Sequence, residues 1–294
     1  MNGVQLALAI VFQPETRYIR RGVQHHGSAF KQEYLQFGRI DPNPFSFWEF
    51  VQPLTLFRYV SIAVPTIAYT MVFCVASVMM TVEIPQLFIP KFGFNSQQIG
   101  LQFLGVIIGT IIGEQLGGAL SDTWMRRRGK ALSKQQGHEV HPEAEWRLWL
   151  SYLGFILVFV GEIVFLVRLQ QAPEGKWNVT PIIGIALAAC GNQIITTVLV
   201  TYAIDSHPEQ ASSIGVFVNF VRQLWGFIGP FWYVAENVNC SIMILTLPRF
   251  PSMFDNVGIG ASAGVVCALV AGVSLIPTIW LQWRGQHHRE KKVA

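Results

Sequence analysis

Long apolar stretches, separated by shorter polar segments, dominate this sequence. A helix needs about 20 apolar residues to cross the hydrocarbon core of a bilayer, and six stretches are long enough. They cover residues 59–82, 99–120, 148–169, 179–203, 214–233 and 259–283. Backbone polar groups find no water in lipid, so each stretch must be helical. The pattern therefore predicts an all-α integral membrane protein with a six-helix transmembrane bundle at residues 59–283.

The remaining segments are expected to have other roles. Residues 1–13 contain a short apolar run that looks like the last turns of a preceding transmembrane helix. Residues 14–58 are expected to form a cytoplasmic linker, and residues 284–294 a cytoplasmic tail. The outer loop at 234–249 fits its surroundings poorly. The sequence leaves open whether this loop is genuine or a retained intron.

Composition supports the membrane assignment. Charged residues make up 13% of the chain and hydrophobic residues 51%, whereas soluble domains carry about 25% charged residues. The net charge of +4 therefore does not indicate nucleic-acid binding. No nucleophile–base pair, metal cluster or phosphate-binding loop stands out in the sequence. We expect no enzyme activity, no cofactor and no metal.

Basic residues are distributed unevenly between the loops. They are concentrated before the first predicted span, between the second and third, and after the sixth. The other loops contain few lysines or arginines. The positive-inside rule therefore places both termini in the cytoplasm. We expect the plasma membrane, with the vacuolar membrane as the alternative.

Three stretches resemble a known family. Residues 117–130, GGALSDTWMRRRGK, resemble the cytoplasmic loop motif of the major facilitator superfamily, a glycine–acid–basic pattern. The segment PETRYIRR, from Pro14, resembles the end of the sixth helix in that superfamily. Residues 191–232 are similar to helices ten and eleven of a fungal branch of proton-linked polyamine, histidinol and multidrug carriers.

This resemblance implies that the chain is the C-terminal half of a twelve-helix transporter. Such folds pair two six-helix bundles around a site near the midplane. The implied partners are the lipid bilayer, a small organic solute, protons and a missing N-terminal six-helix half. The leading expectation is proton-coupled transport of a cationic solute by alternating access. The alternatives are multidrug efflux, or a fragment that transports nothing alone.

The basic motif is expected to lie at the cytoplasmic mouth of the second span. There its acid and arginines can pair with neighbouring helix ends and close a gate. The alternative is that they only anchor the orientation of the chain. The residues assigned to this cytoplasmic gate are Gly118, Asp122, Arg126, Arg127, Arg128, Gly129 and Lys130.

Ionisable groups within the spans are candidates for function, because a charge at the bilayer centre costs about 2.5–3.5 kcal/mol. We expect Glu114, in the second span, to bind a cationic substrate or carry a proton. The alternative is a structural hydrogen bond to a neighbouring helix. Glu162 ranks lower, because the resemblance places the third span at the periphery. Beside Glu114, small residues at every fourth position predict close helix packing. These are Gly105, Gly109, Gly113 and Gly117.

Polar side chains of the fourth and fifth spans complete the predicted site. Asn192 and Gln193 are expected either to bond across helices or to face a wet cavity. Arg222 needs an anion in lipid, and its expected partner is Glu114, a substrate carboxylate or a carboxylate of the missing half. The predicted substrate-binding or proton-coupling residues are Glu114, Asn192, Gln193, Asn219, Arg222 and Gln223.

Overall fold

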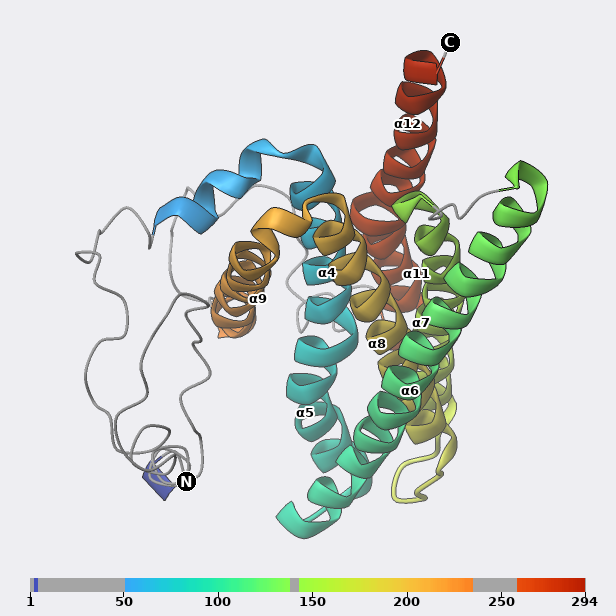
Figure 1. Cartoon of the computed structure of the whole chain (residues 1–294). Coiled ribbons are helices and arrows are strands. Elements are labelled where there is room, and N and C mark those ends of the chain that lie inside the picture. The colour runs from blue at the N-terminus through green and yellow to red at the C-terminus, as the bar shows by residue number, and fades with distance from the viewer. Residues whose placement is uncertain (1–2, 5–50, 138–142, 235–257, 294) are drawn as a thin grey trace, which may run out of the picture. The chain divides into compact units, whose positions relative to one another are not determined.

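A computed structural model shows how the predicted spans are arranged (Figure 1). The structure describes residues 3–4, 51–137, 143–234 and 258–293. All regular structure within these ranges is helical, which confirms the predicted fold class. The chain divides into two units, Met1–Phe50 and Val51–Ala294, and the second unit contains the bundle.

Two expected features lie largely outside the described residues. Of the predicted helix remnant at 1–13, the structure describes Gly3 and Val4. Of the questioned loop at 234–249, it describes the backbone of Val234. The end of the predicted linker is described and is helical. It forms a short 3-10 helix, η1 (Gln52–Arg58), whose Leu56 is buried in the bundle.

The remaining helices follow the six predicted spans in order. Two of the spans contain a π-helical turn, which divides each of them into three labelled elements. The elements are α4 (Val60–Phe73), η2 (Cys74–Met79), α5 (Met80–Phe92), α6 (Ser96–Gln136), η3 (Ala144–Leu148), α7 (Trp149–Gln171), α8 (Thr180–Ser206), η4 (Pro208–Gln210), α9 (Ala211–Val234), α11 (Ile259–Val270), η5 (Ala271–Leu275) and α12 (Ile276–Val293).

Within the described ranges, five helical segments are long and apolar enough to cross a membrane. They are Val60–Phe92, Ser96–Lys134, Ala144–Gln171, Thr180–Ser206 and Ile259–Arg284. The other predicted span corresponds to α9, a helix of 24 residues. Its side chains are described only as far as Phe227. All six predicted spans are therefore helical, and five of them have the length and hydropathy of a transmembrane helix.

The largest departure from the expected boundaries concerns α6. The basic motif was expected to be a loop beyond residue 120, but the helix continues through the motif for a total length of 41 residues. The extension contains no proline, and a single interior glycine costs a helix only about 1 kcal/mol. The helix ends at Gly137, where φ is 72° and the backbone is left-handed. The motif is therefore a rigid projection of the second span.

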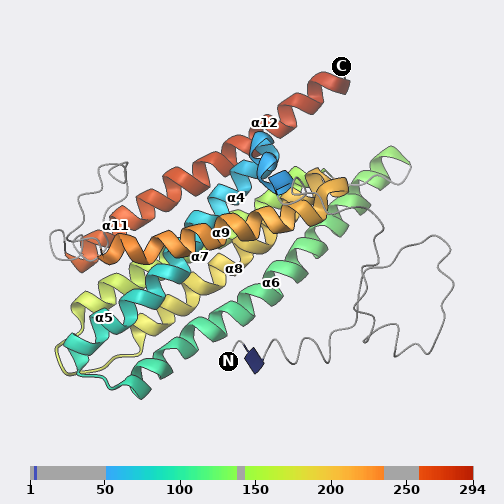
Figure 2. The same cartoon turned by 90° about the vertical axis from the view of Figure 1, so that its left-hand side faces the viewer.

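Close contacts made by glycines place α8 at the centre of the bundle. It packs against α4, α6, α7 and α9, and Figure 2 shows it between α6 and α9. On α6, a Cβ added to Gly113 would lie 2.4 Å from the carbonyl oxygen of Cys190. On α7, a Cβ added to Gly161 would lie 2.4 Å from the backbone nitrogen of Ala188. The predicted close packing of the α6 glycines is thus confirmed, and α7 packs in the same way.

The last predicted span contains a π-helical turn that lies just before a proline. Pro277 has no N–H group, so the carbonyl four residues earlier, at Val273, loses its α-helical partner. The wider turn η5 includes that carbonyl. Within the turn, the buried Ser274 hydroxyl donates to the carbonyl oxygen of Ala68 on α4, at 2.9 Å. The last span is thereby joined to the first at mid-length.

The two ends of the bundle differ in charge. At one end, Lys91 donates to the carbonyl oxygens of Leu169 and Gln170 (the latter at 3.1 Å), where a cation stabilises the C-terminus of α7. The other end, at the top of Figure 1, contains the end of α6, the start of α7 and the end of α12. We call it the basic end, because residues 126–130, Arg147 and Arg284 lie there.

Candidate functional site

A hydrogen bond between α6 and α8 joins two of the predicted site residues. The amide Nε2 of Gln193 donates to Oε2 of Glu114 at 3.1 Å. Glu114 is exposed, and apolar side chains that are also exposed flank it on α6, among them Ile111 and Leu116. A carboxylate facing acyl chains is costly. This face of α6 is therefore suited to a water-filled cavity or to a second protein surface.

The other polar groups of α8 bond differently. The hydroxyls of Thr196 and Thr197 donate to the carbonyl oxygens of Asn192 and Gln193, at 2.7 and 3.0 Å within the same helix. Asn192 is buried, and its Oδ1 has no hydrogen-bond partner within the described ranges. Of the two predicted residues, Gln193 thus bonds across helices, while Asn192 presents a buried acceptor.

Arg222 does not pair with Glu114 in this structure. It packs on α4 instead, where its Nη1 donates to the hydroxyl of Tyr69 at 3.5 Å and its guanidinium lies 5.4 Å from the centre of the Phe73 ring. Its Nε is buried and has no hydrogen-bond partner among the described residues. No ion pair to Arg222 occurs in the part of the chain that the structure describes. The guanidinium therefore keeps hydrogen-bonding capacity for an anion.

The six predicted site residues consequently form two groups. Glu114, Gln193 and Asn192 lie along α6 and α8, while the other three lie on α9. Asn219 and Gln223 are exposed on that helix. The helix α8 lies between α6 and α9 (Figure 2). Within the described residues, no side-chain hydrogen bond therefore links the two groups. A ligand that touched both groups would have to lie across the half-buried face of α8.

A cluster of charges connects three elements at the basic end. Arg147, on η3, has a side chain that is only 12% exposed. Its Nε lies 3.1 Å from Oδ2 of Asp205 at the end of α8, and its Nη1 lies 3.7 Å from Oδ1 of Asp122 on α6. The same Nη1 donates to the hydroxyl of Ser121 at 2.6 Å. Asp122 therefore pairs with a neighbouring element, as predicted, but its partner is a residue that the prediction omitted.

The other members of the predicted gate motif contribute fewer contacts. The guanidinium of Arg128 lies 3.8 Å from the centre of the Trp146 ring, and Trp124 donates to the carbonyl oxygen of Trp146 at 3.1 Å. A Cβ added to Gly118 would meet no atom within 4 Å, so packing does not require glycine there. The remaining members are exposed or half-buried: Arg126, Arg127, Gly129 and Lys130.

Three charged residues were not among the predicted site residues: two were overlooked, and one was ranked low. Arg147 and Asp205 stand at the ends of predicted spans, and their spacing in sequence gave no sign that they pair. Glu162 of α7 was expected to be peripheral, yet it is only 1% exposed. Neither of its carboxylate oxygens has a hydrogen-bond partner within the described ranges. The signal that could have raised its rank is its position near the middle of an apolar span.

Comparison with known proteins finds similar sequences among fungal efflux pumps and transporters. A protein of Aspergillus flavus named "Probable efflux pump mfs2" is 28% identical over 198 residues, which are 67% of this chain and 40% of the pump. The efflux pump FUBT of Fusarium oxysporum is 25% identical over 87% of this chain and 44% of the pump. The MFS-type transporter tndD of Aspergillus flavipes is 24% identical over 68% of this chain and 33% of the transporter. The chain is similar to fungal efflux pumps.

The chain spans less than half the length of each of these relatives. No family model and no solved structure matches it. The apolar helices confirm a helical, multi-pass membrane protein, and the relatives that it resembles are named as efflux pumps and transporters. None of the three names mentions polyamines, so the expected polyamine branch receives no support from them.

Proposed function

We propose that the chain forms one six-helix half of a transporter that exports small organic molecules. The names of its relatives favour efflux, which the sequence offered only as an alternative. The observation that carries the proposal is the Glu114–Gln193 pair on an exposed face. A carboxylate held there by one amide donor keeps acceptor capacity for a proton or a cationic group of a substrate.

The exposed face of α6 supports the presence of a second helical half. Apolar side chains along its whole length are exposed, including Leu101, Leu104, Ile108 and Ile112. Lipid acyl chains would cover these apolar side chains, but they offer no polar partner to Glu114 on the same face. A second bundle covers the apolar positions and encloses water around the carboxylate. The relatives are long enough to contain such a half, because this chain covers only 33–44% of their lengths.

The position of Glu114 supports proton coupling as part of this proposal. A charged carboxylate attracts a cationic substrate, and a protonated carboxyl does not. Exchange of a proton for substrate at one carboxyl group therefore links the two fluxes. Gln193 holds the side chain against α8 in both states, because its amide can donate to either form of the carboxyl group.

The cluster around Arg147 is proposed as the cytoplasmic gate. It joins α6, η3 and α8 at the basic end, which the positive-inside rule assigns to the cytoplasm. Rearrangement of the helix ends at this end, beyond the glycine contacts between α6 and α8, breaks the pairs with Asp122 and Asp205. Each pair is partly exposed and therefore weak, as suits a contact that breaks in every transport cycle.

Dye transport into inside-out yeast vesicles tests the proposed function. The chain is produced alone and together with the complementary half of a similar efflux pump, and uptake of a cationic dye is driven by a pH gradient. We expect uptake above that of empty vesicles when both halves are present. If neither combination transports any of a panel of cationic and neutral dyes, the proposed export function is wrong.

The Glu114→Gln variant then tests the carboxylate, with Glu174→Gln in the loop after α7 as the control. Gln preserves the size of the side chain but neither ionises nor accepts a proton. We expect gradient-driven uptake to fall at least tenfold, as removal of an essential general acid–base group would produce. Preserved dye exchange without a gradient indicates a proton carrier, whereas loss of exchange for cationic dyes alone indicates a substrate ligand. Unchanged uptake would remove Glu114 from the mechanism.

A further inference from the structure

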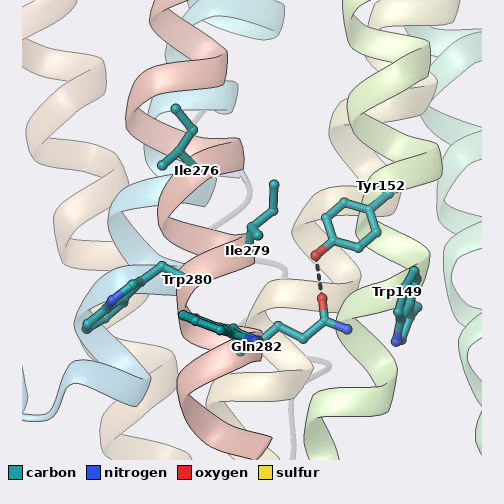
Figure 3. A pocket seen from close by; sticks show the side chains of 7 residues that line it. Trp149, Tyr152, Ile276, Ile279, Trp280 and Gln282 are labelled. Carbon is teal, nitrogen blue, oxygen red and sulfur yellow. Dashed lines mark hydrogen bonds between the residues drawn. The ribbon is translucent and has the colours of Figure 1, made fainter. Parts of the chain in front are cut away.

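A groove between α7 and α12 lies apart from the proposed transport site. It has a volume of about 630 Å³, within the range of small-molecule sites. Its walls are apolar, and its side chains come from the start of α7 and the first two turns of α12 (Figure 3). The wall residues are Trp149, Ile276, Ile279, Trp280 and Trp283, all of them exposed. A molecule that covered them would bury a large apolar area.

One polar group lies among these apolar walls. The hydroxyl of Tyr152 donates to Oε1 of Gln282. Gln282 is only 6% exposed, and its amide nitrogen points along the groove toward Trp149 (Figure 3). The described residues offer this nitrogen no hydrogen-bond acceptor. An amide donor open to the groove can donate to an oxygen atom of a ligand.

A positive charge stands at the rim of the groove. The guanidinium of Arg284 lies 5.0 Å from the centre of the Trp280 ring. Further basic residues follow along α12, namely Arg289, Lys291 and Lys292. Tryptophans are typical of helix segments at the headgroup level of a membrane. The groove therefore combines an apolar wall, an amide donor and a cation at the depth where lipid headgroups lie.

We propose that this groove binds an anionic phospholipid of the cytoplasmic leaflet. The acyl chain covers the tryptophan and isoleucine wall, the amide of Gln282 donates to an ester or phosphate oxygen, and Arg284 pairs with the negative headgroup. A zwitterionic phospholipid offers the same chain and ester oxygens but no net charge, and a sterol offers neither ester nor charge. The anionic leaflet attracts basic segments close to the membrane, which favours this occupant over the other two.

Native mass spectrometry of the chain in an uncharged detergent tests the site. The probes are phosphatidylserine, phosphatidylcholine with the same acyl chains, and ergosterol. We expect one tightly retained phosphatidylserine and at least fivefold weaker retention of phosphatidylcholine, as one basic group near an anionic headgroup would produce. Equal retention of the two phospholipids, or preferred retention of ergosterol, would overturn the proposal.

Variants locate the bound lipid. Arg284→Gln is expected to lower phosphatidylserine retention about fivefold, to the level of phosphatidylcholine. Arg168→Gln, at the opposite end of α7, is the matched control and is expected to change nothing. Ile279→Trp fills the groove and should reduce retention of both phospholipids, with helicity checked by circular dichroism. Full retention in Arg284→Gln and Ile279→Trp would place the lipid elsewhere and refute the assignment.

Discussion

Replacing Gly109 by alanine is expected to force α6 and α8 apart. A Cβ at this position would lie 2.1 Å from the carbonyl oxygen of Ala186, and 2.8 and 2.9 Å from two further backbone atoms of that residue. All three are main-chain atoms, so no side-chain rotation relieves the contact. The helices must separate by roughly 1 Å before the contact becomes an ordinary one.

The expected loss of stability follows from two opposing effects. Overpacking of a close interface typically destabilises by about 1–3 kcal/mol. Alanine also stabilises a helix relative to glycine by up to about 1 kcal/mol. Gly118→Ala isolates the second effect, because a Cβ there meets no atom within 4 Å on the same helix. We therefore expect Gly109→Ala to be less stable than Gly118→Ala by about 1–3 kcal/mol.

The measurement is the free energy of unfolding of both variants in mixed micelles titrated with sodium dodecyl sulfate and followed by circular dichroism. Wild type and Gly118→Ala should unfold at similar denaturant fractions, with the variant equal or slightly more stable. Gly109→Ala should unfold earlier. If Gly109→Ala proves as stable as Gly118→Ala, α6 does not pack on α8 through its glycines, and the packing described above is wrong.

Three further predictions use the same unfolding assay or hydrogen exchange. Arg147→Gln removes the cation shared by two acids and should lower the free energy of unfolding by about 1 kcal/mol; an equal loss in the exposed control Arg126→Gln would contradict this. Glu162→Met removes a buried carboxyl group that lacks a hydrogen-bond partner and should raise that free energy by about 1–3 kcal/mol, so a decrease would refute the reasoning. Lys91→Met removes the cation at the C-terminus of α7 and should speed amide exchange in its last turn, whereas the loop control Lys176→Met should leave exchange unchanged.

The basic motif continues a helix that the apolar pattern ends at residue 120. The apolar pattern located all six helices because bilayer thickness sets a minimum length that few other segments reach. It misplaced the end of α6 because the charges of residues 122–130 mark the membrane boundary but do not terminate a helix. The terminating signal is Gly137, which adopts a left-handed conformation at the C-terminus of α6.

For a related reason, the sequence indicated candidate polar residues but not the contacts between them. A lone carboxylate in an apolar span is visible in sequence, so Glu114 was a candidate before its contacts were known. Its partner Gln193 was one of several polar groups on α8, and helical periodicity could not decide which of them faces α6. The same periodicity could not show that Arg222 packs against Tyr69 rather than near Glu114, because that depends on the position of α8 between α6 and α9.

The hydropathy and charge of the chain are enough to predict a helical membrane bundle and to show which end carries the basic residues. Both properties follow from the composition of contiguous segments, since hydropathy and charge act locally along the chain. Which polar groups meet depends instead on how the helices pack in the folded protein. The hydrogen bond of Glu114, the cluster around Arg147 and the groove beside Gln282 each combine residues from helices that are distant in sequence. Such contacts depend on how closely helices approach, and here that approach depends on glycines whose partners only the folded structure reveals.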